Sequence, residues 1–445
     1  MTHRRVVITG IGIVAPNGIG KQAFWRKLIA GESAVDRVSA FDASKYPCQI
    51  AAEVRDFSAT DFMSAATAKT MGRFSQFAVA AGRLAVEDAK LTITSELSEQ
   101  VGIAQGTALA GIGDIAADVF RAYFADDLPG IPRAIVNEYP VHVATTHVAE
   151  ELRIHGPALS IATNCCTGLD AIYSAYAQIK LGKTRVSLAG ASDAPVLPAP
   201  FASFCAFGVL TRRNHDPKRA SRPYDDERDG IVAAEGGASL VLEDLDFAFK
   251  RGAKIYAEVL GHGGATEPGS SPQRQATGRG MARAIRAALS DAAVEASQID
   301  HINAHGCSFG HQDLCDTNGF KQALGGHAYK VPITSIKSMI GQGFGAAGVL
   351  QTAAACLSID HQRVPPTINQ EVRDPRCDLD YVPNVSKAVN IDRVLINGQG
   401  TGGSYAALVI GRHDRGGAAP IATETELALR ASISSTGASA ARGEL

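Results

Sequence analysis

A cysteine lies between an apolar run and an amphipathic one, in the sequence Thr163-Asn-Cys-Cys-Thr-Gly168. Residues 159–162 read as a strand, and apolar side chains at helical spacing follow from Leu169 to Ile179. Cys165 therefore precedes a helix N-terminus, where backbone N–H groups and the helix dipole lower the pKa of a thiol. Because the thiolate is the reactive form, this position favours a nucleophile. Two small buried residues at a tight turn would give the same pattern.

A histidine follows a second apolar strand, predicted at 301–304, in the segment Asn303-Ala-His-Gly-Cys-Ser-Phe-Gly310. At the carboxyl end of a strand, His305 can act as an acid or base or hydrogen-bond a carbonyl group. A structural histidine that caps the loop is an equal alternative. A metal site would have to combine His305, Cys307, His311, Asp313 and Cys315. Their spacing matches no common zinc motif, so we expect no metal ion.

Two further segments combine polar side chains with glycine. Lys337 lies between a predicted strand at 333–335 and the glycine-rich residues 341–348, and would bring positive charge to a site. A solvated lysine beside a packing helix is the alternative. Residues 397–403, Asn-Gly-Gln-Gly-Thr-Gly-Gly, lack the Gly-Lys-Ser/Thr of a phosphate-binding loop. The N-terminal glycines likewise form no dinucleotide-binding fingerprint, since Ala15 takes the third glycine's place.

Apolar runs alternate with amphipathic segments along most of the chain. Strands are expected at 5–9, 101–107, 159–162, 186–189, 239–242, 255–260, 301–304, 333–335, 394–397 and 405–410. Helices are expected at 21–30, 112–124, 169–179, 280–295, 313–324 and 345–358. Strands separated by helix-length segments indicate an α/β fold with buried parallel strands. The similar order of elements in the two halves indicates a structural duplication, although no clear internal repeat is present.

Composition excludes several classes of protein. The 43 Lys and Arg residues balance 45 Asp and Glu residues, which argues against a general nucleic-acid binder. Eight irregularly spaced cysteines, without a repeated Cys-x-x-Cys pair, favour a reduced, cytoplasmic setting. No apolar stretch reaches the roughly 18 residues of a membrane span, and the run from Val6 to Ile8 is too short for a signal-peptide core. We expect a soluble protein without membrane contact.

Taken in order, these segments resemble the β-ketoacyl-acyl-carrier-protein synthases, the ketosynthases of the thiolase superfamily. The likeness extends from Val6 to about Arg412 and includes 101–107 and 221–230. The resemblance implies a thiolase-like αβαβα layered fold of two pseudo-duplicated halves with mixed five-stranded sheets. The halves would be residues 1–250, carrying the nucleophile, and 251–412. Residues 413–445, rich in Ala, Ser, Thr and Gly, are expected to be disordered or to contact a partner.

The resemblance also implies roles for individual residues. Cys165 matches the acyl-accepting nucleophile of the motif T-A-C-x-x-G, and His305 matches the first catalytic histidine of N-A-H-G-T-S-T. Lys337 matches the family's lysine. Two supporting acids follow His305: Asp313 eight residues beyond it, and Asp316 where the family often has the partner of its lysine. The backbone N–H groups of Cys165 and Gln399 would form an oxyanion hole.

The sequence departs from the family pattern at several site positions. The second catalytic histidine, in K-S-x-x-G-H, is replaced by Gln342. The gating loop N-S-F-G-F-G-G is residues 397–403, so Gln399 and Thr401 replace its phenylalanines and are expected to reshape the entrance of the acyl pocket. The loop after His305 is also altered, and Cys166 follows the nucleophile.

In the family reaction, acyl transfer to the cysteine precedes decarboxylation of a malonyl thioester, and the resulting enolate attacks the acyl-enzyme. Two histidines polarise the malonyl carbonyl group. Gln342 can still donate a hydrogen bond there, but it cannot carry a proton. Loss of one such donor or its charge costs about 10²–10³-fold in comparable oxyanion sites. We therefore expect acyl loading on Cys165 to survive better than decarboxylative condensation.

The first interpretation is thus an atypical condensing acyltransferase of polyketide or fatty-acid synthesis that needs no cofactor. A non-elongating transacylase is the second interpretation. The third is a catalytically quiet partner subunit of a heterodimer, because such subunits typically lack the nucleophile and Cys165 is present. The expected partners are an acyl carrier protein, acyl and malonyl thioesters, and a second subunit in a homodimer or heterodimer. Acyl carrier proteins are acidic, so the basic residues of one loop could form the docking patch, the alternative being an ordinary solvated loop. These residues are Arg212, Arg213, Lys218 and Arg219.

Overall fold

The computed structural model describes residues 4–112, 116–131, 138, 140–268 and 272–413. Contacts divide the chain into residues 1–412 and 413–445, and the description below concerns the first unit. The predicted tail lies outside the described residues, except for His413. No helix among the described residues has the length and apolar character needed to cross a membrane.

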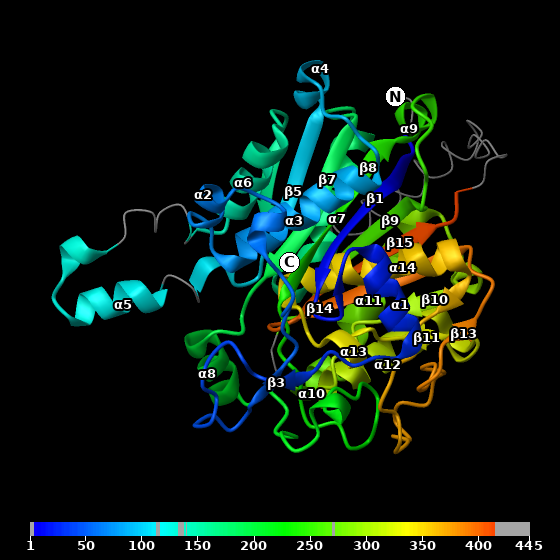
Figure 1. Ribbon diagram of the computed structural model, residues 1–445. Coiled ribbons are helices and arrows are strands. Elements are labelled where there is room, and N and C mark those ends of the chain that lie inside the picture. Colours follow the sequence, from blue (N-terminus) through cyan, green and yellow to red (C-terminus); the bar gives the residue numbers. More distant parts are fainter. Residues whose placement is uncertain (1–3, 113–115, 132–137, 139, 269–271, 414–445) are drawn as a thin grey trace, which may run out of the picture. The chain divides into compact units, whose positions relative to one another are not determined.

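An eleven-stranded sheet forms the framework (Figure 1). Its path is β11-β10-β14-β15-β9-β1-β8-β7-β5-β6, with β2 (Gly18–Ile19) paired to β1 beside it. In chain order the strands of the path are β1 (Val6–Ala15), β5 (Val101–Gly106), β6 (Ala158–Ile161), β7 (Val186–Asp193), β8 (Gly236–Asp244), β9 (Ala257–Thr266), β10 (His301–Asn303), β11 (Ile333–Thr334), β14 (Arg393–Gly400) and β15 (Ser404–Gly411). Two small pairs stand apart, β3 (Asp36–Arg37) with β4 (Ile50–Ala51) and β12 (Arg363–Val364) with β13 (Lys387–Ala388).

The path consists of two sets of five strands with the same mixed arrangement. In the first set β6, β5 and β7 are parallel, while β8 and β1 continue antiparallel. In the second, β11, β10 and β14 are parallel, while β15 and β9 continue antiparallel. The sets meet where β1 pairs with β9 over only three residue pairs, from Val6–Val259 to Ile8–Ala257. This arrangement confirms the predicted fold class.

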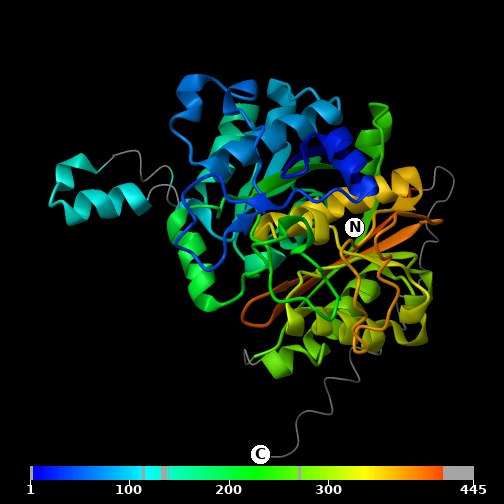
Figure 2. The ribbon, with the colours of Figure 1, turned by 60° about the horizontal axis from the view of Figure 1, so that its bottom comes forward.

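Helices form three layers around the two sets of strands (Figures 1 and 2). The outer face of the first set contacts α3 (Arg73–Asp88) and α6 (Val143–Leu152). Between the sets lie α7 (Thr167–Lys180) and α14 (Ala347–His361), which contact each other and strands of both sets. The outer face of the second set carries α11 (Arg279–Ala292), against which α12 (Gly310–Leu324) packs.

The remaining helices lie in the connections. They are α1 (Lys21–Ala30), α2 (Ala65–Ala68), α4 (Ser95–Ser98), α5 (Ala116–Phe124), α8 (Pro198–Phe207), α9 (Leu245–Lys250), α10 (Pro272–Gln275) and α13 (Lys337–Ile340). Two 3₁₀ turns, η5 (Asn164–Cys166) and η9 (Phe344–Ala346), lead directly into α7 and α14.

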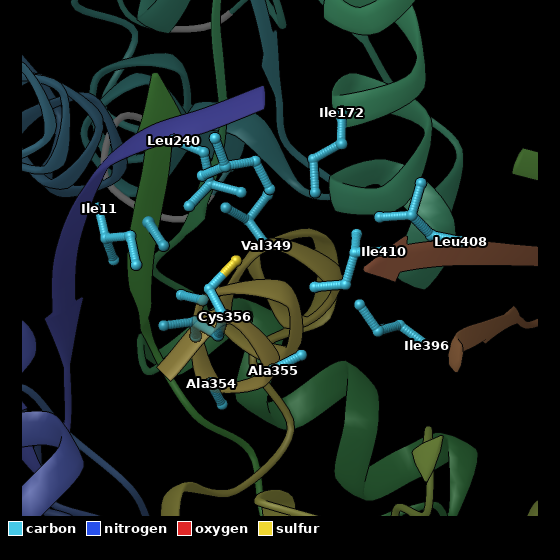
Figure 3. Packing of buried hydrophobic residues seen from close by; sticks show 14 of the residues in the cluster. Ile11, Ile172, Leu240, Val349, Ala354, Ala355, Cys356, Ile396, Leu408 and Ile410 are labelled. Carbon is cyan, nitrogen blue, oxygen red and sulfur yellow. The ribbon is translucent and has the colours of Figure 1, made fainter. Parts of the chain in front are cut away.

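Alternating side chains of the strands fill the spaces between the layers. Leu408 and Ile410 of β15 belong to the central cluster, which also includes Ile11, Leu240 and Val349 (Figure 3). Val409 of the same strand points to the outer cluster, formed with α11 and α12. The helix α14 is buried from Ala347 to Ile359, which is why most of its side chains are apolar on all sides. Because successive side chains of a strand point to opposite faces, one face of each set of strands packs against α7 and α14 and so positions these two central helices.

The two central helices touch at their N-termini through glycine. A Cβ atom on Gly168 would lie 2.6 Å from the backbone N of Val349, and one on Gly348 would lie 2.7 Å from the backbone N of Leu169. The turns that lead into these helices also match. Asn164 (φ 57°) and Phe344 (φ 49°) each begin a 3₁₀ turn in the left-handed region. This repeated local geometry is the structural duplication that the sequence shows only as element order.

The predicted strands and helices match observed elements, with differences at some ends. The helix α1 has the predicted bounds, whereas β1 continues from the predicted end at Thr9 to Ala15. Gly10 and Gly12 lie in this added part of the strand. A Cβ atom at Gly10 would lie 2.2 Å from the carbonyl oxygen of Ala85, and one at Gly12 would lie 1.9 Å from that of Ala81, so the strand can pass α3 this closely only with glycine at both positions. The helices α3, α6 and α8 were not predicted, and part of the helix predicted at 112–124 lies outside the described residues.

We predict that Gly168→Ala lowers the free energy of unfolding by roughly 3 kcal/mol or more, since the new methyl group meets backbone rather than a movable side chain. Denaturant unfolding measures the change. As a control, Gly326→Ala should have little effect, because a Cβ atom there has no neighbour within 4 Å. Equal stability of Gly168→Ala and the wild type would contradict the importance of this contact.

Candidate active site

Cys165 lies in η5, between β6 and α7, and its side chain is buried. Its Sγ–H donates to Oδ1 of Asn164 at 3.0 Å, and Nε2 of Gln342 donates to Sγ at 3.3 Å. Burial raises the pKa of the thiol to about 12, although the charge of Lys337 opposes the rise. Desolvation therefore outweighs the lowering expected from the helix N-terminus, and the net shift of the thiol pKa in the free protein is upward.

The backbone around Gln342 fixes its side chain beside the thiol. Gly341 follows α13 with a φ of 72°, and a Cβ atom there would lie 2.9 Å from Cβ of Ala234. The N–H of Gln342 then donates to the carbonyl oxygen of Val232 at 2.8 Å, and its carbonyl oxygen accepts from Ala234 at 3.0 Å. Gln342 Oε1 is buried and has no hydrogen-bond partner among the described residues. The amide thus offers an unused acceptor next to the nucleophile.

His305 follows β10 and is completely buried. Its Nδ1 accepts a hydrogen bond from the backbone N–H of Gln399 at 3.4 Å, so Nε2 carries the proton of the neutral ring. Within the described part of the chain, Nε2 has no hydrogen-bond partner. Burial, reinforced by the charge of Lys337, holds the pKa of His305 well below its usual value. The ring is therefore a neutral donor at physiological pH.

Lys337, the first residue of α13, stabilises the loop that carries His305. Its Nζ donates to the carbonyl oxygen of His305 and to Oε1 of Gln351 at 3.1 Å. Burial lowers the pKa of Lys337 to about 8. Among the described residues no ion pair joins Lys337 to Asp316, which corrects the pairing implied by the family pattern.

The two supporting acids instead hold the loop after His305. Asp316 Oδ2 accepts from the N–H of Gly306 at 2.7 Å, and Asp313 Oδ1 accepts from the N–H of Cys307 at 2.9 Å. Burial raises the pKa of both acids, that of Asp316 to about 7. Arg228 lies 3.4 Å from Asp313 and supplies positive charge. The acids therefore hydrogen-bond backbone amides, and their charges act on Lys337 without a direct ion pair.

The loop at the end of β14 passes beside the nucleophile, but its side chains face elsewhere. A Cβ atom on Gly398 would lie 3.4 Å from the carbonyl oxygen of Cys165. The side chain of Gln399 donates to the carbonyl oxygen of Gln312 at 2.8 Å and to Asp316 Oδ1 at 3.0 Å. Thr401 is exposed. A gating movement of Gln399 would have to break both hydrogen bonds.

Cys165 belongs to a cluster of buried apolar side chains, surroundings that would favour an acyl chain over a polar group. Its buried members include Phe201 of α8, Leu210, Ile231 and Phe344. The rings of Phe204 and Phe344 stack with centroids 4.8 Å apart. Because α8 was not predicted, sequence analysis missed this lining. A local signal was present in the apolar sequence Pro-Ala-Pro-Phe-Ala-Ser-Phe of residues 198–204.

Two polar residues of the site were also missed. Gln351 of α14 accepts from Lys337 and donates to the carbonyl oxygens of Asn303 and Asn397, both at 3.1 Å, so it links three segments of the site. Its signal was a polar residue within an otherwise apolar helix. Asn164 contacts the nucleophile directly. An asparagine is typical of a residue in the left-handed region.

The other two candidates from the sequence were a metal site and a basic docking loop. Among the described residues no group of three or more His, Cys, Asp and Glu side chains is arranged to hold a metal ion. In the basic loop, Arg213 lies 3.6 Å from Glu227, and Arg219 pairs with Glu371. Lys218 donates to the carbonyl oxygen of Ser33 at 3.0 Å. The loop is therefore partly neutralised by neighbouring acids.

The five-layer fold, with a buried thiol at the start of a central helix and the Gln342 amide donating to it, defines a thiolase-fold acyltransferase. Comparison with known sequences agrees. The model of the β-ketoacyl synthase N-terminal domain matches residues 3–248, and that of the C-terminal domain matches residues 256–371. The chain belongs to the β-ketoacyl synthase family, whose members are condensing enzymes.

Similar proteins come from both fatty-acid and polyketide synthesis. The chain is 37% identical to 3-oxoacyl-[acyl-carrier-protein] synthase 2 of Synechocystis, over 93% of this chain and 99% of that protein. It is 39% identical to the actinorhodin polyketide putative β-ketoacyl synthase 1 of Streptomyces coelicolor, over 94% of this chain and 90% of that protein. Among solved structures, the ishigamide ketosynthase/chain length factor matches with a TM-score of 0.86 and 35% identity, over 93% of this chain and 100% of that one.

We predict that the alkylation of Cys165 by iodoacetamide rises about tenfold per pH unit from pH 6.5 to above pH 9, because only the thiolate reacts and its pKa is raised. No inflection near pH 6.5 is expected, since His305 stays neutral. Peptide mass spectrometry measures the rate, with the half-buried Cys205 as an internal reference. A plateau below pH 8 would show that Cys165 is already ionised.

Proposed function

We propose that Cys165 accepts an acyl group from an acyl carrier protein and that the acyl-enzyme condenses with a malonyl thioester. The observation that carries this proposal is the amide donor beside the thiol, together with a second buried donor on the loop that follows β10. Gln342 Nε2 lies 3.3 Å from Cys165 Sγ, and Nε2 of His305 is a buried donor without a partner among the described residues. A thioester carbonyl oxygen next to Cys165 needs donors of this kind.

In the loading step, Cys165 Sγ attacks the thioester carbonyl carbon. The bond from that carbon to the carrier's sulfur breaks, and the thiol proton ends on the released carrier thiol. The negative charge that develops on oxygen needs the N–H groups of Cys165 and Gln399. In the free protein these N–H groups donate to Asn164 and His305. Acyl binding therefore has to exchange both hydrogen bonds for bonds to the thioester.

In the condensation step, the malonyl thioester loses CO₂, and the electron pair of the broken bond forms an enolate. His305 Nε2–H stabilises the enolate oxygen, and the Gln342 amide takes the place of a second donor. The enolate carbon then attacks the acyl carbonyl carbon, and Cys165 leaves as a thiolate. Because Gln342 cannot hold a proton, this step depends on hydrogen bonding alone at that position.

A non-elongating transacylase is the second candidate, and a specific contact favours it. Gln342 Nε2 donates to the thiol itself. In the free protein, the residue that replaces the second histidine therefore hydrogen-bonds Cys165, the residue that accepts the acyl group. Acyl transfer needs Cys165 and the oxyanion donors but no enolate. A quiet partner subunit ranks third, because the nucleophile is present and buried beside its donors.

We propose that the protein acts in the cytoplasm with a carrier protein and a second subunit, identical or related. One similar solved structure is the complex of a type II polyketide synthase acyl-carrier protein with its ketosynthase. The match has a TM-score of 0.84 and 33% identity, and it covers 93% of this chain and 100% of that one. Among the described strands of this chain, β6 pairs only with β5, and Leu159 on β6 is 46% exposed. An open strand edge with an exposed leucine fits the contact with the second subunit.

We predict that acyl carrier protein bearing a medium-length acyl chain transfers that chain to the wild-type protein and that Cys165→Ala abolishes the transfer. Intact-protein mass spectrometry detects the added acyl mass. The matched control is Cys166→Ala, which removes the neighbouring thiol and should keep loading. Persistent loading of Cys165→Ala would place the acyl group elsewhere, and no loading of the wild type would favour the quiet subunit.

We predict that Gln342→His raises the rate of decarboxylative condensation about 10²-fold, because it restores a second titratable donor at the enolate oxygen. Loading should change far less. Release of CO₂ from malonyl carrier protein and formation of the extended product report the rate. A wild-type protein that loads without decarboxylating malonyl would favour the transacylase, and an unchanged rate in Gln342→His would show that this position does not limit condensation.

A further inference from the structure

Asn164 differs from the family motif T-A-C-x-x-G, which has alanine directly before the nucleophile. The residue is exposed and adopts a φ of 57°. Its Oδ1 accepts hydrogen bonds from both the backbone N–H of Cys165, at 2.7 Å, and the thiol of Cys165, at 3.0 Å. One side-chain oxygen therefore binds the two groups of the nucleophile that take part in acyl transfer.

A thioester carbonyl oxygen would need the same backbone N–H. We propose that Asn164 is a positioning residue that keeps Cys165 in a closed resting state, with its side-chain oxygen in the place of the substrate oxygen. This inference rests on the proposed acyl loading of Cys165. An incoming thioester displaces the amide, takes over the N–H of Cys165 and frees the thiol to attack.

The surroundings of Asn164 allow its side chain to turn away. The residue is exposed, and among the described residues its amide nitrogen has no hydrogen-bond partner, so the two hydrogen bonds from Cys165 are the only ones that its side chain makes there. Rotation about the side-chain bonds needs no change of the backbone. The left-handed backbone of the turn is compatible with asparagine in either side-chain position.

The contact also affects the reactivity of the thiol. A hydrogen bond from S–H to a carbonyl oxygen stabilises the neutral thiol, and the same oxygen would repel a thiolate. It also uses the N–H that could stabilise the thiolate. Removal of the Asn164 side chain should therefore make Cys165 ionise at lower pH, whereas a carboxylate at the same position should have the opposite effect.

The test compares Asn164→Gly with Asn164→Asp. Glycine adopts positive φ without a steric cost, so it removes the side chain and keeps the turn, and aspartate keeps both the size and the turn. We expect alkylation of Cys165 by iodoacetamide at pH 8 to be about fivefold faster in Asn164→Gly, which corresponds to ~1 kcal/mol for one hydrogen bond. Its pH profile should shift to lower pH, and that of Asn164→Asp to higher pH.

Asn384→Gly is the matched control, because Asn384 has a similar φ of 59° and lies outside the site. Its alkylation rate should equal that of the wild type. Shifts of both Asn164 variants in the same direction, or unchanged rates in both, would overturn the proposal. Alkylation needs no carrier protein, so it tests Asn164 independently of acyl loading. If the pH profiles of the two Asn164 variants shift in opposite directions but the protein cannot be acylated, the role of Asn164 is supported and the proposed loading is refuted.

Discussion

The close contact between the N-termini of α7 and α14 is the constraint on which the site depends. Gly168 and Gly348 let the two backbones approach until a single methyl group on either would meet the other helix. Each helix is preceded by a turn with a positive φ, and the first of these turns carries Cys165. Because both helices are buried between the two sets of strands, the position of the nucleophile follows from the packing of the whole fold.

The chemistry-bearing residues could be predicted from the sequence because each follows a recognisable element. Cys165 and His305 come directly after apolar strands, and Gln342 could be placed only through the family motif. The sequence does not show which contacts these residues make. Gln351 joins three segments that are 14, 48 and 46 residues away, and no local pattern indicates such partners.

The sign of the Cys165 pKa shift shows a second limit of local reasoning. A helix N-terminus favours the thiolate and can be read from the sequence. The charge of Lys337 also favours it, but its proximity to Cys165 comes only from the structure. Desolvation opposes them and depends on every layer that covers the residue. The same burial keeps His305 neutral and lowers the pKa of Lys337. The strands and central helices could be predicted by their periodicity, but the degree of burial of one side chain could not.

Both of the described side chains that hydrogen-bond the nucleophile in this site are amides. Gln342 donates to the thiol and Asn164 accepts from it, so the nucleophile rests between two side chains that cannot gain or lose a proton. The buried acids near His305 are engaged in holding the backbone of its loop. Neither of these two amides can therefore take part in proton transfer. A site of this kind is suited to exchanging one thioester for another, and its capacity for carbon–carbon bond formation depends on how well a neutral imidazole and a neutral amide stabilise an enolate.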